Sequence, residues 1–76
     1  MVSHYDERFE YLVERLRRAR AEAKLSQSQV ADKVGLTQPL VSRIEAGQRK
    51  IDPIELAMLC RLYRKPVKYF VPEMPV

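Results

Sequence analysis

Four residues of the chain, Gln38, Pro39, Ser42 and Arg43, have side chains that suit the edges of DNA base pairs. Glutamine can form two hydrogen bonds with adenine, and arginine can do the same with guanine. A serine hydroxyl can reach a base or a phosphate, and a proline ring can touch a thymine methyl group. Their spacing places them together on one helix side, which predicts a base-reading surface; the alternative is an ordinary solvated helix face.

The opposite side of the same segment is apolar. Leu40, Val41 and Ile44 recur at helical spacing, which indicates a helix over about residues 38–46 packed against a core. Pro39 is tolerated there because the first-turn N–H groups of a helix have no intrahelical partner. The free N–H groups and the positive dipole at such a helix start also suit a phosphate.

Three helix-start signals follow one another along the chain. Ser26 with Gln29, and Asp52 with Glu55, have the spacing of a capping box, and Thr37 is a third capping residue. Gly35 and Gly47 stand where helices end. Together with the apolar periodicity, these signals predict helices at about residues 6–24, 27–34, 38–46 and 53–63, and a short fifth helix beginning at Pro66.

The predicted fold class is all-α: a five-helix bundle with no β-type alternation. The helix at 53–63 is rich in apolar residues, so we expect it to be the central and most buried one. A glycine turn joins the two short helices at 27–34 and 38–46, which is the pattern of a helix-turn-helix unit. We expect one domain over residues 1–76, with its core at about 16–70 and loosely ordered ends at 1–5 and 71–76.

Composition limits the function classes. The 76 residues carry 14 lysines and arginines against 10 acids, for a net charge of +4, which favours a polyanionic partner. The run "RLRRAR" contributes to this charge; we interpret it as a solvated face in which Glu14 and Glu22 pair with Arg18, with direct DNA contact as the alternative. No segment reaches the length of a membrane span and no signal peptide is evident, so we expect a cytoplasmic protein.

Catalysis and metal binding are not expected. The chain has one histidine, His4, near its start, and one cysteine, Cys60, on an apolar helix face, so no nucleophile stands beside an oriented base. One cysteine also provides neither a disulfide nor a cysteine metal cluster. We expect no enzyme activity, no metal and no cofactor.

The stretch "LSQSQVADKVGLTQPLVSRIEAGQRKIDPIEL" resembles the Cro/lambda-repressor type of helix-turn-helix domain, also called XRE-type. The resemblance covers about residues 16–70. Its features are Leu25 and Gln27 at the entry to the second helix, Ala31 within it, Gly35 at its exit, and Val41-Ser42-x-Ile44-Glu45-x-Gly47 in the third.

The resemblance implies roles for individual residues. The helix at 38–46 would be the recognition helix, with Gln38, Pro39, Ser42 and Arg43 facing the bases. An ion pair between Arg20 and Glu45 would tie the first helix to the third; the alternative is two independent surface charges. The DNA backbone would be bound by Gln27 and by the loop after the third helix, and we add the helix-start residues, so that the expected phosphate-binding set is Gln27, Ser28, Thr37, Gln48, Arg49 and Lys50.

Two positions depart from the family pattern. Relatives usually have Leu-Gly-Val after the fourth helix, where this chain has Tyr63-Arg64-Lys65, which leaves the end of that helix open to question. Proline at position 39 is uncommon, so base preference cannot be transferred from relatives.

The function expected from this resemblance is a bacterial or phage-type transcriptional regulator, a repressor, that binds double-stranded DNA. One such domain covers few base pairs, so we expect a homodimer that reads a near-palindromic operator. Tyr69, Phe70 and Val71 are the expected dimer contacts. The alternative functions are an antitoxin that binds a toxin, with or without DNA binding, and a helical interaction domain without DNA.

Overall fold

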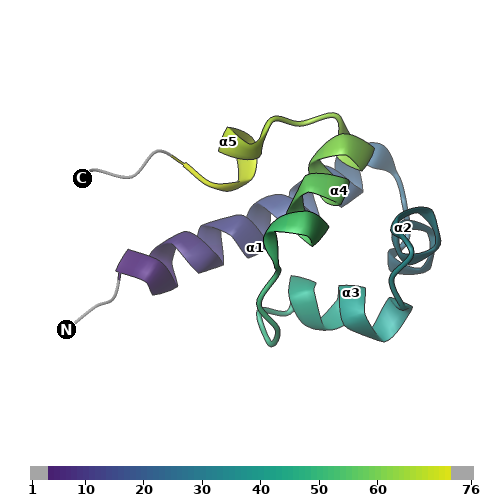
Figure 1. The fold of residues 1–76 in the computed structure, drawn as a ribbon, viewed down its shortest axis with the longest axis horizontal. Coiled ribbons are helices and arrows are strands. Elements are labelled where there is room, and N and C mark those ends of the chain that lie inside the picture. The colour runs from purple at the N-terminus through teal and green to yellow at the C-terminus, as the bar shows by residue number, and fades with distance from the viewer. Residues whose placement is uncertain (1–3, 73–76) are drawn as a thin grey trace.

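The computed structural model describes residues 4–72 of the chain, with side chains from residue 7. It contains five helices and no strand within that range: α1 (His4–Ala23), α2 (Gln27–Val34), α3 (Gln38–Glu45), α4 (Pro53–Tyr63) and α5 (Val67–Phe70) (Figure 1). The all-α, five-helix prediction is therefore confirmed.

The expected bounds of α2 and α4 match the observed ones, and those of α1, α3 and α5 differ by one or two residues. α1 begins at His4 rather than at residue 6, so His4 and Tyr5, predicted to be loosely ordered, are helical. Ala46 follows α3 as its C-cap, and Pro66 precedes α5 as its N-cap. Of the predicted loose ends, residues 1–3 and 73–76 lie outside the described residues.

Side-chain caps fix where three of the helices begin. At α2, the Gln29 N–H donates to Ser26 Oγ at 3.0 Å and the Ser26 N–H donates to Gln29 Oε1 at 2.8 Å. Asp52 and Glu55 form the same reciprocal box at α4, at 2.7 and 3.0 Å. Thr37 accepts from the Leu40 N–H at 3.4 Å, and no return bond forms because leucine occupies the third helical position. All three predicted starts are confirmed.

The C-caps of α2 and α4 are left-handed residues. Gly35 follows α2 with φ of 72° and turns the chain into α3. Arg64 takes φ of 56° at the end of α4, the position at which the family usually has glycine. The departure from the family pattern therefore leaves the turn geometry in place, but at the conformational cost of a side chain in the left-handed region.

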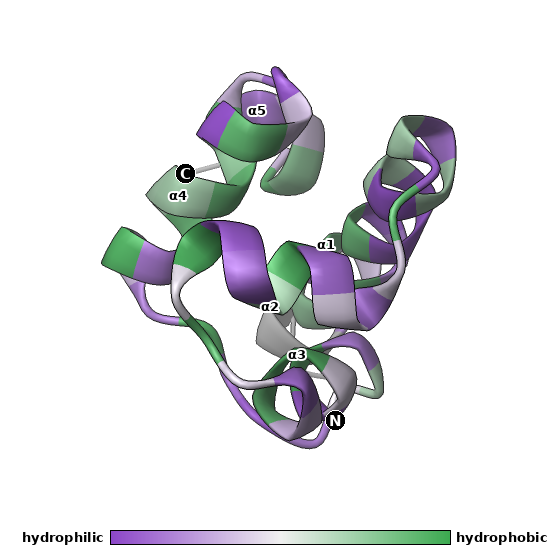
Figure 2. Ribbon diagram, turned by 90° about the vertical axis from the view of Figure 1, so that its right-hand side faces the viewer, coloured by the Kyte–Doolittle hydropathy of each residue, from purple (hydrophilic) through white to green (hydrophobic). Residues whose placement is uncertain are grey.

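The core is built mainly on α1, not on α4 as expected. Leu12, Val13, Leu16 and Ala19 of α1 are all buried, whereas α4 buries only Leu59 and Tyr63 among its hydrophobic residues. Figure 2 shows hydrophobic residues along most of α4, and one of them, Ile54, is 72% exposed. A helix that is apolar on most of its circumference leaves part of that surface in solvent unless it is surrounded on all sides.

The helix-turn-helix unit stands at one edge of the molecule. α2 packs closely on α3, and α3 runs along the lower border of the view in Figure 1, with the other helices on one side of it. This arrangement leaves the opposite side of α3 uncovered.

Candidate nucleic-acid interface

The two sides of α3 differ as the sequence predicted. Val41 and Ile44 are buried in the core, and Leu40 packs against it. Gln38, Pro39 and Arg43 are exposed and Ser42 is half-buried. The four predicted base-reading residues thus lie together on the open side of one helix, from its first turn to its last.

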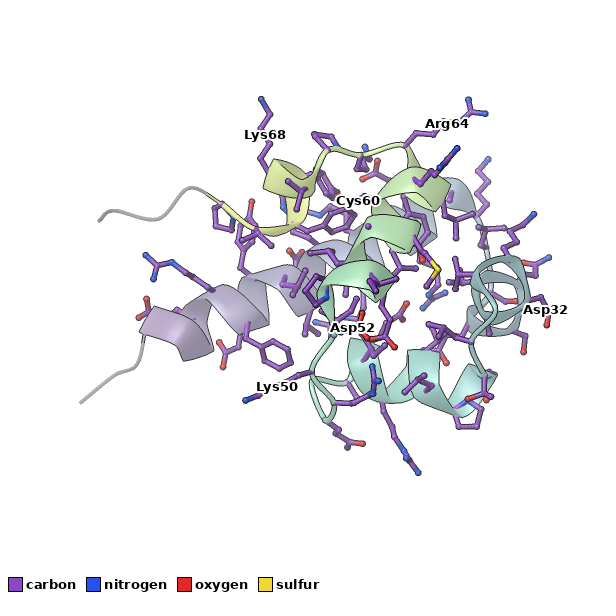
Figure 3. The ribbon with its side chains drawn as sticks, viewed as in Figure 1. Asp32, Lys50, Asp52, Cys60, Arg64 and Lys68 are labelled. Atoms are coloured by element: carbon purple, nitrogen blue, oxygen red, sulfur yellow. The ribbon has the colours of Figure 1, made fainter. Side chains whose placement is uncertain are left out.

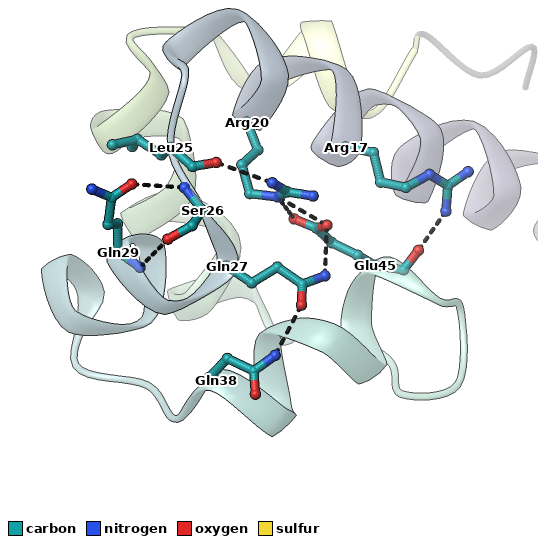
Figure 4. Close-up of polar contacts among 8 residues, drawn as sticks. All are labelled: Arg17, Arg20, Leu25, Ser26, Gln27, Gln29, Gln38 and Glu45. Atoms are coloured by element: carbon teal, nitrogen blue, oxygen red, sulfur yellow. Dashed lines mark hydrogen bonds and ion pairs between the residues drawn. The ribbon is translucent and has the colours of Figure 1, made fainter.

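Gln38 is held by its neighbours before any ligand binds. Its Nε2 donates to Gln27 Oε1 at 3.0 Å, and Gln27 Nε2 donates in turn to Glu45 Oε1 at 3.2 Å (Figure 4). The chain of hydrogen bonds runs from the first turn of α3, through the start of α2, to the last turn of α3. Gln27, predicted to bind phosphate, therefore also positions a predicted base-reading side chain.

Glu45 is the centre of this network. Its side chain is only 5% exposed, and Arg20 Nε donates to both of its carboxylate oxygens, at 3.0 and 2.8 Å. Arg20 also donates from Nη1 to the Leu25 carbonyl at 3.0 Å. The ion pair implied by the resemblance is present, and it connects α1, the start of α2 and the end of α3.

The buried charge of Glu45 affects the groups around it. The hydrogen bond to Glu45 raises the pKa of Arg20 above its ordinary value, so this guanidinium stays charged. Burial, followed by the negative charge of Glu45, raises the pKa of Tyr63 to about 12. At neutral pH, Arg20 therefore stays charged and Tyr63 stays neutral.

The C-terminal end of α3 has a cap that the sequence reasoning missed. Arg17 Nη1 donates to the Glu45 carbonyl oxygen. A guanidinium at this place satisfies an orphan carbonyl and opposes the negative end of the helix dipole. Arg17 belongs to "RLRRAR", so part of that run packs against α3 instead of forming only a solvated face.

The rest of that run follows the expected pattern in part. Arg18 pairs with Glu14 at 3.0 Å, as predicted. Glu22, however, pairs with Lys65 at 3.2 Å and accepts from the Tyr69 hydroxyl at 3.3 Å. The i, i+4 rule could not predict this partner, because Lys65 is far from Glu22 in sequence.

The loop after α3 presents its predicted phosphate-binding residues unequally. Gln48 and Lys50 are exposed, but Arg49 is half-buried and its Nη1 donates to Glu55 Oε1 at 2.6 Å. The same nitrogen donates to the Lys50 carbonyl at 3.1 Å. The hydrogen bond from Arg49 lowers the pKa of Glu55, which is itself buried and closes the capping box of α4. Arg49 is thus a structural residue of this loop as well as a candidate phosphate ligand.

The two other candidate phosphate ligands lie near helix starts. Ser28 is exposed in the first turn of α2, and Thr37 is exposed as the N-cap of α3. In sequence, Ser28 precedes the turn at Gly35 and Thr37 follows it. Their placement fits a surface that follows a DNA backbone.

The predicted dimer residues do not share one surface. Phe70 is completely buried, so its assignment to the dimer interface was wrong; it is a core residue of the monomer. Tyr69 is half-buried, and the cationic groups of Arg15 and Lys65 lie 4.5 and 4.8 Å from the centre of its ring. These contacts hold α5 on α1. Val71 is half-buried.

No cluster of metal-ligating side chains is found among the described residues. In the same part of the chain, no helix is long and apolar enough to cross a membrane.

Comparison with known proteins decides the family. A helix-turn-helix family model, of the Cro/C1 type, matches residues 16–70. The chain is a Cro/C1-type helix-turn-helix protein. The match covers the range predicted from the motif, and it extends from the middle of α1 to the end of α5. No curated protein matches the chain significantly.

Membership in the Cro/C1-type helix-turn-helix family makes the protein a DNA-binding regulator. The Arg20–Glu45 pair and the Gln27–Gln38 hydrogen bond hold α3 of this Cro/C1-type protein against α1 and α2.

Proposed function

We propose that the protein is a sequence-specific repressor that inserts α3 into the major groove of double-stranded DNA. The observation that carries the proposal is the open polar side of α3, where Gln38 and Arg43 are exposed opposite the buried Val41 and Ile44. A helix fits a major groove about 12 Å wide when its outer side is not bulky. Pro39 and Ser42 are small, so the surface between the longer side chains of Gln38 and Arg43 is not bulky.

Each exposed side chain of α3 has a separate task in this proposal. The Arg43 side chain is exposed, so its guanidinium is available for two bonds to guanine. Gln38 donates from Nε2 to Gln27, which fixes its amide so that its oxygen can accept from adenine N6. Ser42 can reach a base or phosphate, and Pro39 can touch a thymine methyl group.

Contacts to phosphate supply most of the affinity. The proposed contacts come from the start of α2, the start of α3 and the loop after it: Gln27, Ser28, Thr37, Gln48, Arg49 and Lys50. Gln48 and Lys50 are exposed and adjacent to the end of α3. Because cations bound at phosphates are released on association, binding should weaken steeply as salt is added.

The regulator acts as a homodimer in the cytoplasm, where the DNA is. Two recognition helices about 34 Å apart read a near-palindromic operator in successive major grooves. Occupancy of such an operator blocks transcription, and repression is therefore the activity that we propose.

Selection of bound duplexes from a random pool tests the proposal. We expect a two-fold symmetric consensus, and Arg43→Ala should relax preference at one base pair of each half-site with a loss of about 1–3 kcal/mol. Arg61→Ala is the matched control, since Arg61 is an exposed arginine on α4. If the parent and Arg43→Ala bind all duplexes equally, α3 does not read sequence.

A second candidate function is that of an antitoxin, which binds a toxin with or without DNA. Two large hydrophobic side chains, Ile54 and Val67, remain exposed, which favours a protein partner of some kind. Stoichiometric copurification with a toxin, combined with α3 variants that lose no DNA affinity, would replace the first function with the second.

A further inference from the structure

A groove of about 630 Å³ runs along the outer side of α4 and is bordered by the start of α5. The α4 residues that line it recur at helical spacing, on the side away from the buried Leu59 and Tyr63. Its uncharged lining is Pro53, Leu56, Ala57 and Cys60 of α4, with Pro66 and Val67 as the opposite wall.

Much of this apolar surface remains in solvent. Val67 is 56% exposed, and Pro53, Ala57 and Pro66 are exposed as well. Cys60 is half-buried, and burial raises the pKa of its thiol, so that the thiol is protonated at neutral pH and belongs to the apolar floor. Contiguous apolar surface on a folded domain marks an interaction site.

The charged residues that line the groove are all basic among those described: Arg61, Arg64 and Lys65. Glu22 pairs with Lys65 at 3.2 Å and offsets its charge. Arg61 and Arg64 are exposed and give the edge of the groove a positive charge. An occupant that carries acidic side chains beside its apolar ones is complementary to this arrangement.

The backbone of Arg64 supplies an independent sign of function. Its φ of 56° lies in the left-handed region, which disfavours any residue with a side chain. Strained residues of this kind cluster at binding sites, where the position of the side chain matters more than its conformational cost. Here the strained residue holds a guanidinium at the edge of the groove.

The end of α4 lies away from the DNA-binding surface. Arg64 projects from the upper part of the molecule in Figure 3, whereas α3 runs along the lower border of the same view in Figure 1. DNA held by the open side of α3 therefore leaves this part of α4 uncovered, and the groove can be occupied at the same time.

Three other occupants fit the groove less well. A small ligand is buried over most of its surface in its site, but much of this lining is exposed. A second copy related by a two-fold axis would bring Arg61 and Arg64 of each copy towards those of the other. A DNA backbone offers phosphates to the arginines but no apolar group to the floor.

We propose that the groove between α4 and α5 binds an acidic amphipathic helix of a partner protein. The apolar side of that helix covers Leu56, Cys60 and Val67, as in other complexes in which a helix lies in an apolar groove. Its acidic residues lie beside Arg61 and Arg64. The regulator can thus hold a second protein while α3 is on DNA.

Fluorescence anisotropy of the full chain with a labelled helical peptide of about 18 residues tests the proposal. Leucines at helical spacing form one side of this peptide and glutamates the other. The parent should bind it with a dissociation constant below about 100 μM, and a second peptide with lysine in place of every glutamate should bind at least tenfold more weakly. No binding at about 0.5 mM, or equal binding of the two peptides, overturns the proposal.

Charge reversal separates the groove from the DNA-binding surface. Arg61→Glu should weaken peptide binding about tenfold at low salt and less at high salt, and should leave DNA binding unchanged. Arg43→Glu, the same change on α3, should do the opposite. If Arg43→Glu loses the peptide and Arg61→Glu does not, the peptide occupies the DNA-binding surface and the proposal is wrong. If the parent binds no DNA but the peptide results hold, the groove stands and the proposed function fails.

A pair of apolar variants tests the floor of the groove. Val67→Ser should weaken peptide binding about fivefold at both low and high salt, because it removes apolar contact and no charge. Ile54→Ser is the matched control, since Ile54 is an exposed large hydrophobic residue that is not part of the lining. Circular dichroism checks that both variants fold. Equal losses in the two variants contradict the proposed site.

Cys60 provides a direct readout, because it is the only cysteine of the chain and lines the groove. The acidic peptide at about ten times its dissociation constant should slow the reaction of Cys60 with a thiol reagent about tenfold. An unchanged rate places the peptide elsewhere and overturns the proposal. If vesicles of phosphatidylglycerol slow the reaction and the peptide does not, the groove binds lipid instead of a protein helix.

Discussion

Arg20 and Glu45 join the first and third helices through two hydrogen bonds from one nitrogen, Arg20 Nε, to both carboxylate oxygens. The Glu45 side chain is 5% exposed and that of Arg20 is 24% exposed, so water screens the pair little. The same carboxylate accepts from Gln27, whose oxygen accepts from Gln38. The orientation of α3, and of one base-reading residue, thus depends on one buried charge.

Breaking this ion pair should destabilise the domain strongly. Arg20→Ala leaves the Glu45 carboxylate buried without its cation, and we expect a loss of about 3 kcal/mol in the free energy of unfolding. Urea denaturation at fixed protein concentration measures it. The control is Arg18→Ala, which removes the exposed pair with Glu14 and should cost at most about 1 kcal/mol. Equal losses in both variants would contradict the role assigned to Glu45.

Phe70 should behave as a core residue of the monomer. It is completely buried, and its ring lies 5.0 Å from that of Tyr69 and 6.5 Å from that of Tyr63. Phe70→Ala should therefore lower the free energy of unfolding by about 3–5 kcal/mol. Thermal denaturation of Phe70→Ala and Phe70→Leu measures this loss, which should be larger for Phe70→Ala because alanine leaves the larger cavity. A stable Phe70→Ala variant that only fails to dimerise would restore the original interface assignment.

Local signals explain why so much of the fold could be predicted. The capping pairs Ser26–Gln29 and Asp52–Glu55 span three residues, and Gly35 marks a turn by its own conformational freedom. These signals are complete within one turn of helix. The open side of α3 also follows from local periodicity, because Val41 and Ile44 define the buried side.

Such local reasoning could not predict contacts between segments that are distant in sequence. Phe70 is apolar in a short terminal helix, and nothing local distinguishes a core residue from an interface residue there. The bond from Arg49 to Glu55 and the Arg17 cap on α3 depend on how helices are docked. The family resemblance supplied the Arg20–Glu45 pair, which spacing alone leaves undetermined.

The end of α4 offers a stabilising substitution. Arg64 holds φ of 56°, which costs a residue with a side chain about 1–2 kcal/mol relative to glycine, although glycine loses more entropy on folding. Arg64→Gly should therefore raise the free energy of unfolding by about 0.5–1 kcal/mol. Arg61→Gly, within the same helix, is the contrasting variant and should lower it by about 1 kcal/mol. A loss of stability in Arg64→Gly would show that the arginine makes compensating contacts.

The two basic residues of the loop after α3 should respond differently to removal. Lys50→Ala should weaken binding to all duplexes alike and reduce the slope of affinity against salt by about one ion. Arg49→Ala should have the same uniform effect on DNA but should also destabilise the fold, since Arg49 donates to Glu55. Fluorescence anisotropy at several salt concentrations, together with urea denaturation, distinguishes the two variants.

Glu55 should make the stability of the domain depend on pH in the acid range. The hydrogen bond from Arg49 lowers its pKa below the ordinary 4.5, against the opposing effect of burial. Because the folded pKa is depressed, the contribution of this carboxylate is fully present well above pH 4.5 and disappears as pH falls through the folded value. The free energy of unfolding of the parent should therefore exceed that of Glu55→Gln at pH 7, and the difference should shrink as pH falls from about 5 to 3.

Glu14→Gln, which alters an exposed pair, is the control and should show little of this pH dependence. A difference between parent and Glu55→Gln that stays constant over this range would mean that the charge of Glu55 does not stabilise the loop.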